Sequence, residues 1–135
     1  MGGIGLRRTG VSAALALVAA TGGVLLGAGV AQAAPSNCNL GNYCGYYNTR
    51  WAGDIDQYPG NVPDLRRHQH PGHGNWDNQY SSVWNNGTTC QVTFYNNYRY
   101  NHNETYRTFA KGTGRATLGD IGMGNSISSV RWCTV

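Results

Sequence analysis

The chain lacks the sequence patterns that mark most small enzymes and metal-binding domains. It contains no C-x-x-C pair and neither of the hydrolase motifs G-x-S-x-G and H-E-x-x-H. Beyond residue 34 no helical period is sustained, and Gly, Asn and Pro interrupt the chain about every ten residues. These absences argue against a zinc ribbon, an α/β-hydrolase and a helical domain. They leave an all-β domain without a recognisable catalytic constellation.

The first 33 residues are predicted to be a secretion signal. Arg7 and Arg8 precede an almost uncharged Ala/Leu/Val/Gly stretch, which ends in an A-x-A sequence typical of signal-peptidase sites. A membrane anchor is the alternative, because the stretch is long enough to cross a bilayer. Its glycines and the A-x-A ending favour cleavage after Ala33. We therefore expect a signal peptide at 1–33 and one secreted, extracellular domain at 34–135, with no membrane association after cleavage.

The charge of the mature domain is too small and too scattered for nucleic-acid binding. Removal of the signal peptide leaves eight basic residues against six acidic ones, a net charge of +2. Arg66 and Arg67 are the only adjacent basic pair in this domain. A nucleic-acid interface needs a concentrated basic patch, which is missing here.

Four cysteines remain in a mature domain of about a hundred residues, which is small enough to need covalent support. An even number of cysteines in an exported chain indicates two disulfides, although three pairings are open. We favour Cys38 with Cys44, which closes a local loop, and Cys90 with Cys133, which links two distant strands.

Two similar segments indicate an internal duplication. Residues 77–82 (DNQYSS) and 124–129 (GNSISS) lie 47 positions apart, and each leads into a short apolar strand. The aromatic pair Tyr46 and Trp51 is echoed 49 positions later by Tyr95 and Tyr100. Two features repeated at nearly the same offset predict one domain made of two similar β-motifs.

Local signals predict individual elements. Asn86-Gly87 lies between two β-prone runs and predicts a hairpin, because this dipeptide suits the tightest hairpin turns. Val92 and Phe94 alternate with polar residues, which predicts a strand with one buried and one solvated face. Residues 58–76, rich in Pro, Gly and His, are expected to form a long loop.

The repeated segments resemble the βγ-crystallin motif. That motif joins an aromatic corner to a later Asx-Asx-x-x-Ser/Thr-Ser segment, and Tyr46, Trp51, Gly53 and residues 77–82 match both parts. In the second copy His102 replaces the corner glycine and Gly124 replaces the first Asx. The resemblance implies an all-β, βγ-crystallin-like Greek-key sandwich.

Within that fold, the chain resembles the actinobacterial metalloproteinase inhibitor family of secreted peptidase inhibitors. The leader, the early cysteine pair and residues 127–132 carry this likeness. It implies a monomeric, secreted proteinaceous inhibitor of extracellular peptidases, in particular metallopeptidases, that acts as a rigid substrate-like binder. The partner would be a secreted peptidase. The predicted contact is the 58–76 loop, with Val62 and Leu65 as apolar anchors beside Arg66 and Arg67.

The alternative is a calcium-binding βγ-crystallin-type module with an envelope or killer-toxin-like antimicrobial role. In the family motif the third residue offers a carbonyl and the fifth a hydroxyl, and hard cations prefer such oxygen ligands. The corresponding residues, with the nearby carboxylate, are Asp77, Gln79, Ser81, Ser126 and Ser128. The second site has only neutral oxygens, so we expect it to be weak or lost. The same residues also cap turns without any metal, so no cofactor is required.

Two further groups of side chains have residue types found in metal or catalytic sites. His68, His70 and His73 have a spacing that can hold zinc or copper, but no acidic or cysteine ligand lies close in sequence, and an exposed flexible loop is the commoner explanation. Glu104 and His102, flanked by arginines, could imitate a nuclease site. Neighbours on one strand point to opposite faces, so we do not expect an enzyme.

Overall fold

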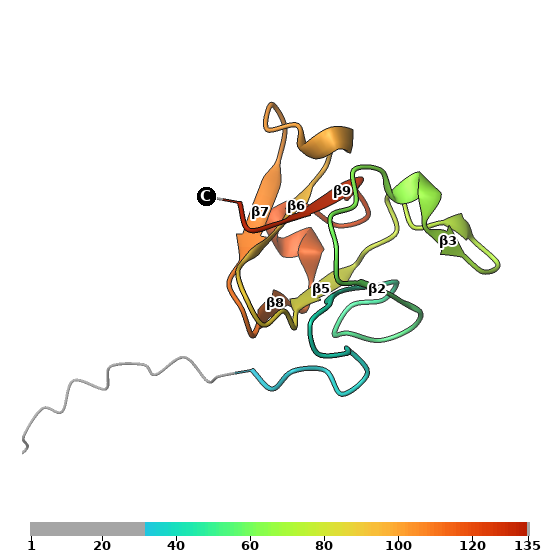
Figure 1. Ribbon diagram of the computed structural model, residues 1–135. Helices are drawn as coiled ribbons and strands as arrows, with labels where there is room; N and C mark the ends of the chain where they lie inside the picture. Colours follow the sequence, from blue (N-terminus) through green and yellow to red (C-terminus); the bar gives the residue numbers. More distant parts are fainter. Residues whose placement is uncertain (1–31, 135) are drawn as a thin grey trace, which may run out of the picture. The chain divides into compact units, whose positions relative to one another are not determined.

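The computed structural model describes residues 32–134, so the predicted signal peptide lies outside the described residues except for its last two positions. This part of the chain contains nine short strands and three 3₁₀ turns, and it has no α-helix (Figure 1). It also contains no helix long and apolar enough to cross a membrane. The strands are β1 (Tyr43–Tyr46), β2 (Ile55–Tyr58), β3 (Gln69–His70), β4 (Gly74–Asn75), β5 (Ser82–Asn85), β6 (Val92–Tyr95), β7 (Tyr106–Phe109), β8 (Thr113–Arg115) and β9 (Ser129–Trp132). The turns are η1 (Leu65–Arg67), η2 (Tyr98–Tyr100) and η3 (Leu118–Ile121).

The strands form two main antiparallel sheets that share elements between the two sequence repeats. One sheet has the order β2-β1-β5-β8 and the other the order β7-β6-β9. Strand β8 belongs to the second repeat but pairs with β5 of the first. In return Val62, from the first repeat, forms an isolated bridge with Val130 in β9. Each half therefore completes the sheet of the other, which explains why the two motifs form one domain.

The main core lies where the two sheets meet. Tyr43 and Val83 from one sheet and Phe94 and Val130 from the other belong to the same buried apolar cluster. The rings of Tyr43 and Phe94 meet edge to face with centroids 5.7 Å apart, an arrangement that aromatic quadrupoles favour. Burial of such side chains stabilises a fold by about 1.5 to 3 kcal/mol each.

Both predicted disulfides are confirmed. Cys38 is bonded to Cys44 and Cys90 to Cys133. The first lies in a smaller apolar cluster with Tyr46 and Trp84. Two disulfides are consistent with an oxidising, extracellular location.

The predicted Asn86-Gly87 hairpin is wrong. Strands β5 and β6 lie in different sheets, and the segment between them crosses from one to the other. Asn86 is bonded instead to the loop before β1, where its amide donates to Asn42 O at 3.0 Å. A glycine is needed at 87 for another reason, because a Cβ there would lie 2.3 Å from the Trp132 ring. The solvated face predicted for this region is also wrong at Thr93, which is 1% exposed.

Candidate functional site

The two repeated serine segments form a matched pair, here called the paired turns (residues 77–82 and 124–129). Asn78 and Asn125, at equivalent positions, both have a left-handed backbone, with φ of 57° and 49°. The amide of each donates to a carbonyl of the other turn at 2.9 Å. The side chains repeat the exchange: Ser81 Oγ donates to Asn125 Oδ1 at 3.1 Å, and Ser128 Oγ donates to Asn78 Oδ1 at 3.4 Å. The sequence repeat therefore corresponds to a local pseudo-twofold arrangement.

The last serine of each turn fixes an aromatic corner. Ser82 Oγ accepts a hydrogen bond from Trp51 N at 3.0 Å and donates one to Asn48 O at 2.7 Å. Ser129 Oγ accepts from Tyr100 N at 3.1 Å and donates to the equivalent carbonyl of the second repeat. Trp51 and Tyr100 both have positive φ, 56° and 60°, so each corner is a strained turn held by a serine. This bonding explains why the corners and the serine segments repeat together.

The predicted calcium ligands differ between the two turns. Asp77 Oδ2 accepts a hydrogen bond from the Tyr98 hydroxyl at 2.6 Å, and this bond raises the pKa of Tyr98 above its usual value. Asp77 Oδ1 is buried and has no hydrogen-bond partner among the described residues. In the second turn the Ser126 hydroxyl donates to Asn96 Oδ1 at 3.1 Å. An unused anionic oxygen is therefore found in the first turn.

Residues 58–76, predicted to be a loop, contain regular structure and are here called the projecting segment. Turn η1 is followed by the short hairpin of β3 and β4, which protrudes from the two sheets at the right of Figure 1. The hairpin closes through His73 N, which donates to His70 O at 2.9 Å. Its base closes through Trp76 N, which donates to His68 O at 2.9 Å. Its tip, residues 71–74, is exposed.

The prediction that Val62 and Leu65 are apolar contact anchors is wrong. Their side chains are 3% and 0% exposed and belong to the main core. Val62 bridges to Val130, and Leu65 N donates to Ser128 O at 3.0 Å. Apolar residues in a loop-like sequence belong here to the core, because the segment exchanges backbone bonds with the other repeat. They hold the projecting segment to the domain.

The two predicted basic contact residues are exposed. Arg66 pairs with Asp64, with Nη2 2.7 Å from Oδ2, and its guanidinium lies 4.0 Å from the centroid of the Tyr98 ring. The hydrogen bond from Arg66 lowers the pKa of Asp64. Arg66 is thus held in one orientation on the surface, beside Arg67.

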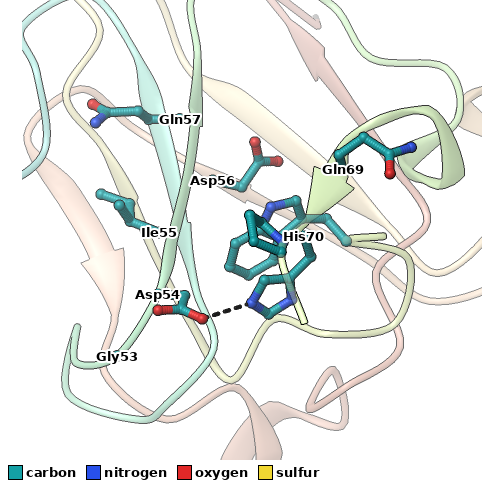
Figure 2. Close-up of a pocket in the computed structure, with 9 residues that line it drawn as sticks. Gly53, Asp54, Ile55, Asp56, Gln57, Gln69 and His70 are labelled. Carbon is teal, nitrogen blue, oxygen red and sulfur yellow. Dashed lines mark hydrogen bonds and ion pairs between the residues drawn. The ribbon is translucent and has the colours of Figure 1, made fainter. Parts of the chain in front are cut away.

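A cleft of about 670 Å³ separates the start of β2 from the hairpin (Figure 2). Asp54 faces His70 across it, with Oδ2 2.9 Å from Nε2. His70 is 1% exposed and stacks on Trp76, with ring centroids 3.8 Å apart and planes at 4°. The ring of His73 lies 4.4 Å from that of His70. One ligand atom each from Asp54, His70 and His73 lie within 4.8 Å of one another.

His68 does not join the other two histidines. Its Nδ1 lies 3.1 Å from both carboxylate oxygens of the buried Asp56. The hydroxyls of Tyr80 and Tyr43 also donate to Asp56. Burial is the main cause that raises the pKa of both tyrosines, and the charge of Asp56 adds to it. The three histidines considered as zinc or copper ligands are thus divided between two carboxylates, Asp54 and Asp56. Neither carboxylate could be predicted as a partner from sequence, because Asp56 precedes His68 by 12 residues and Asp54 precedes His70 by 16.

The nuclease-like candidates gain no support as a pair. His102 and Glu104 are both exposed, and the His102 ring packs edge-on against Tyr95 and Tyr106 with centroids 5.1 Å away. This contact assigns His102 a packing role at the surface.

The fold is similar to those of several solved βγ-crystallin structures. One, described under the evolution of the eye lens βγ-crystallin domain fold, is 21% identical with a TM-score of 0.61, covering 76% of this chain and 95% of that one. A βγ-crystallin from an archaeon is 19% identical with a TM-score of 0.53, covering 70% and 100%. Spherulin 3a from Physarum polycephalum is 20% identical with a TM-score of 0.53, covering 76% and 91%. These likenesses confirm the predicted all-β, βγ-crystallin-like fold.

Comparison with curated proteins finds no match. The model of peptidase inhibitor family I36 matches residues 31–108, which include the projecting segment and the first paired turn. This span is more than half of the chain. The chain therefore belongs to peptidase inhibitor family I36, a family of inhibitors rather than enzymes.

Proposed function

We propose that this protein is secreted after removal of residues 1–33 and inhibits extracellular metallopeptidases by docking the projecting segment as a rigid, substrate-like element. The observation that carries the proposal is the family match, which spans this segment and implies a peptidase partner. The exposed hairpin tip and the neighbouring Arg66 and Arg67 form the contact surface. The protein acts as a monomer.

Preorganisation is the physical basis of the proposed inhibition. A loop that is already ordered loses little conformational entropy when it docks, so more of the contact energy appears as affinity. Val62 and Leu65 fix one end of the segment through the core, and Trp76 fixes the other. The exposed tip between them is short, so few residues need to be ordered on binding.

The test is a titration of the purified protein against a panel of secreted metallo-, serine and cysteine peptidases. We expect saturable, near-stoichiometric inhibition of at least one thermolysin-like enzyme. The double change Arg66→Ala and Arg67→Ala should raise the inhibition constant, whereas Lys111→Ala, at an exposed site in the β7–β8 turn, should leave it unchanged. N-terminal sequencing of the released protein should begin at Ala34.

Zinc capture must be separated from docking, because the histidines could remove the peptidase's metal. Protein loaded with zinc beforehand has no capacity to remove more, so true inhibition should persist with loaded protein. If every peptidase in the panel runs at full rate with excess protein, the inhibitor proposal fails. If only metal-free protein inhibits, docking is replaced by metal capture.

A second candidate function, calcium binding at the first paired turn, is favoured by Asp77 Oδ1, a buried oxygen without a hydrogen-bond partner in the part of the chain that the structure describes. Asp77, Gln79 and Ser81 would hold the ion, which would supply positive charge to this buried oxygen; Ser126 and Ser128 offer only neutral groups. Bound calcium would stabilise the fold by mass action. Melting temperature should then rise with calcium, and Ser81→Ala should reduce the rise more than Ser128→Ala. Identical melting curves in calcium and in chelator would leave the turns a purely structural role.

A further inference from the structure

We propose that Asp54, His70 and His73 form a binding site for a divalent transition-metal ion, with Zn²⁺ as the reference ion. This group is called the His–Asp cluster. It differs from the histidine trio that the sequence analysis considered and did not favour, because His68 is engaged by Asp56 and the third ligand is the carboxylate of Asp54, which directly precedes β2. The proposal does not depend on peptidase inhibition.

The donor set suits a late first-row metal. Imidazole nitrogens and a carboxylate oxygen are common zinc ligands, with bonds of about 2.0 to 2.2 Å. Tetrahedral coordination with such bonds places neighbouring ligand atoms about 3.3 Å apart. The Asp54 Oδ2 to His70 Nε2 distance is already 2.9 Å, and all three ligand atoms lie within 4.8 Å of one another. The three side chains therefore need to move only slightly to enclose an ion.

His70, the buried residue of the cluster, has its ring orientation fixed by packing. His70 is fixed by its stacking on Trp76, so it offers Nε2 in a preset orientation toward Asp54. Its Nδ1 is buried without a hydrogen-bond partner among the described residues, and it can carry the ring proton when Nε2 binds a metal. Asp54 and His73 are exposed, so their side chains can rotate onto the ion.

The His–Asp cluster offers three protein ligands, one fewer than a closed tetrahedral zinc site requires. Three protein ligands leave a fourth position to water, as in zinc sites that exchange ligands. A bound ion would connect the hairpin tip to the segment before β2, across the cleft of Figure 2. It would therefore order the exposed tip of the projecting segment. The His73 ring packs near Tyr47 and His70, with ring centroids 4.6 and 4.4 Å away.

Calorimetric titration of the purified protein with Zn²⁺ tests the site. We expect one ion per chain. We expect Asp54→Asn and His73→Ala each to weaken binding by more than about tenfold, because loss of a direct ligand should cost at least as much as the 10- to 100-fold losses caused by outer-shell changes. His102→Ala is the matched control, since His102 is exposed and lies outside the cluster. It should bind zinc as the unchanged protein does.

Two further measurements distinguish loss of a zinc ligand from unfolding of the variant and from zinc binding elsewhere on the protein. The melting temperature in chelator should be similar for Asp54→Asn and the unchanged protein, and only the unchanged protein should gain stability on zinc addition. Co²⁺ should give the visible absorption of a four-coordinate ion, reduced in His73→Ala. Absence of zinc binding, equal binding by all variants, or loss of binding in His68→Gln but not in His73→Ala would each overturn the proposal.

Discussion

Replacement of Ser82 by alanine should destabilise the domain more than replacement of Ser81, the other serine of the first paired turn. The hydroxyl of Ser82 is buried and serves two backbone groups, Trp51 N and Asn48 O. An unsatisfied buried donor or acceptor costs about 1 to 3 kcal/mol, and water can replace part of the loss because both bonds are only partly buried. We therefore expect Ser82→Ala to lower the free energy of unfolding by about 2 kcal/mol.

The neighbouring Ser81 provides the matched control. Its hydroxyl donates to Asn125 Oδ1 at an exposed position, so in chelator, without calcium, Ser81→Ala should change the free energy of unfolding by no more than about 0.5 kcal/mol. Urea unfolding followed by tryptophan fluorescence measures both, and the slope with urea should be unchanged if only stability differs. Equal losses for Ser81→Ala and Ser82→Ala would refute the assignment of the corner to Ser82. A negligible loss for Ser129→Ala would refute the equivalence of the two repeats.

Two other predictions concern the disulfides and the buried Tyr46. Changing Cys90 and Cys133 to alanine should lower the free energy of unfolding by about 4 kcal/mol, and changing Cys38 and Cys44 should lower it by about 2 kcal/mol. The difference arises because the two disulfides close loops of 43 and 6 residues, and the longer loop restricts the unfolded chain more. Equal shifts in the urea midpoint would contradict this prediction. Burial raises the pKa of Tyr46 from 10.0 to about 12, so the folded state keeps a proton that the unfolded state loses. Stability from this group is complete below pH 10 and should fall as pH rises toward 12, as checked by urea titrations at several pH values; a midpoint that stays constant over this range would contradict it.

The parts of the fold that could be predicted from sequence are those encoded in short, repeated patterns. The paired turns and their aromatic corners each occupy a few residues, so their equivalence is visible as a common offset. The cysteine pairing followed from the positions of two strands. The Asn86-Gly87 hairpin failed because the dipeptide reports a local turn preference, whereas long-range pairing of β5 with β1 and β8 decides where that strand lies.

The parts of the candidate site that could not be predicted depend on contacts across the chain. The sequence around Val62 is typical of a loop, and the β-bridge from Val62 to Val130 explains why this residue is buried. The carboxylates that divide the histidines precede them in a different element, and no local spacing connects Asp54 with His70 or Asp56 with His68. The sequence around the histidines therefore indicates the nitrogen ligands, whereas the carboxylate ligand Asp54 lies too far away along the chain to be recognised.

The duplication itself indicates where function is located. Equivalent corners and serines are separated by 31 residues in the first repeat and 29 in the second, so the two connections have similar lengths. Both connections form a strand after the corner, β2 or β7, and a 3₁₀ turn, η1 or η3. The first leucine amide of each turn donates to a serine carbonyl of the other repeat, Leu65 N to Ser128 O at 3.0 Å and Leu118 N to Ser81 O at 2.9 Å. Among the described residues, the first connection alone adds the β3–β4 hairpin. The shared corners and serines must satisfy the same bonds in both halves, which leaves the connections free to differ. A specialised surface is therefore expected where the copies diverge. The β3–β4 hairpin, which carries His70 and His73 of the His–Asp cluster, has no counterpart in the second copy among the described residues.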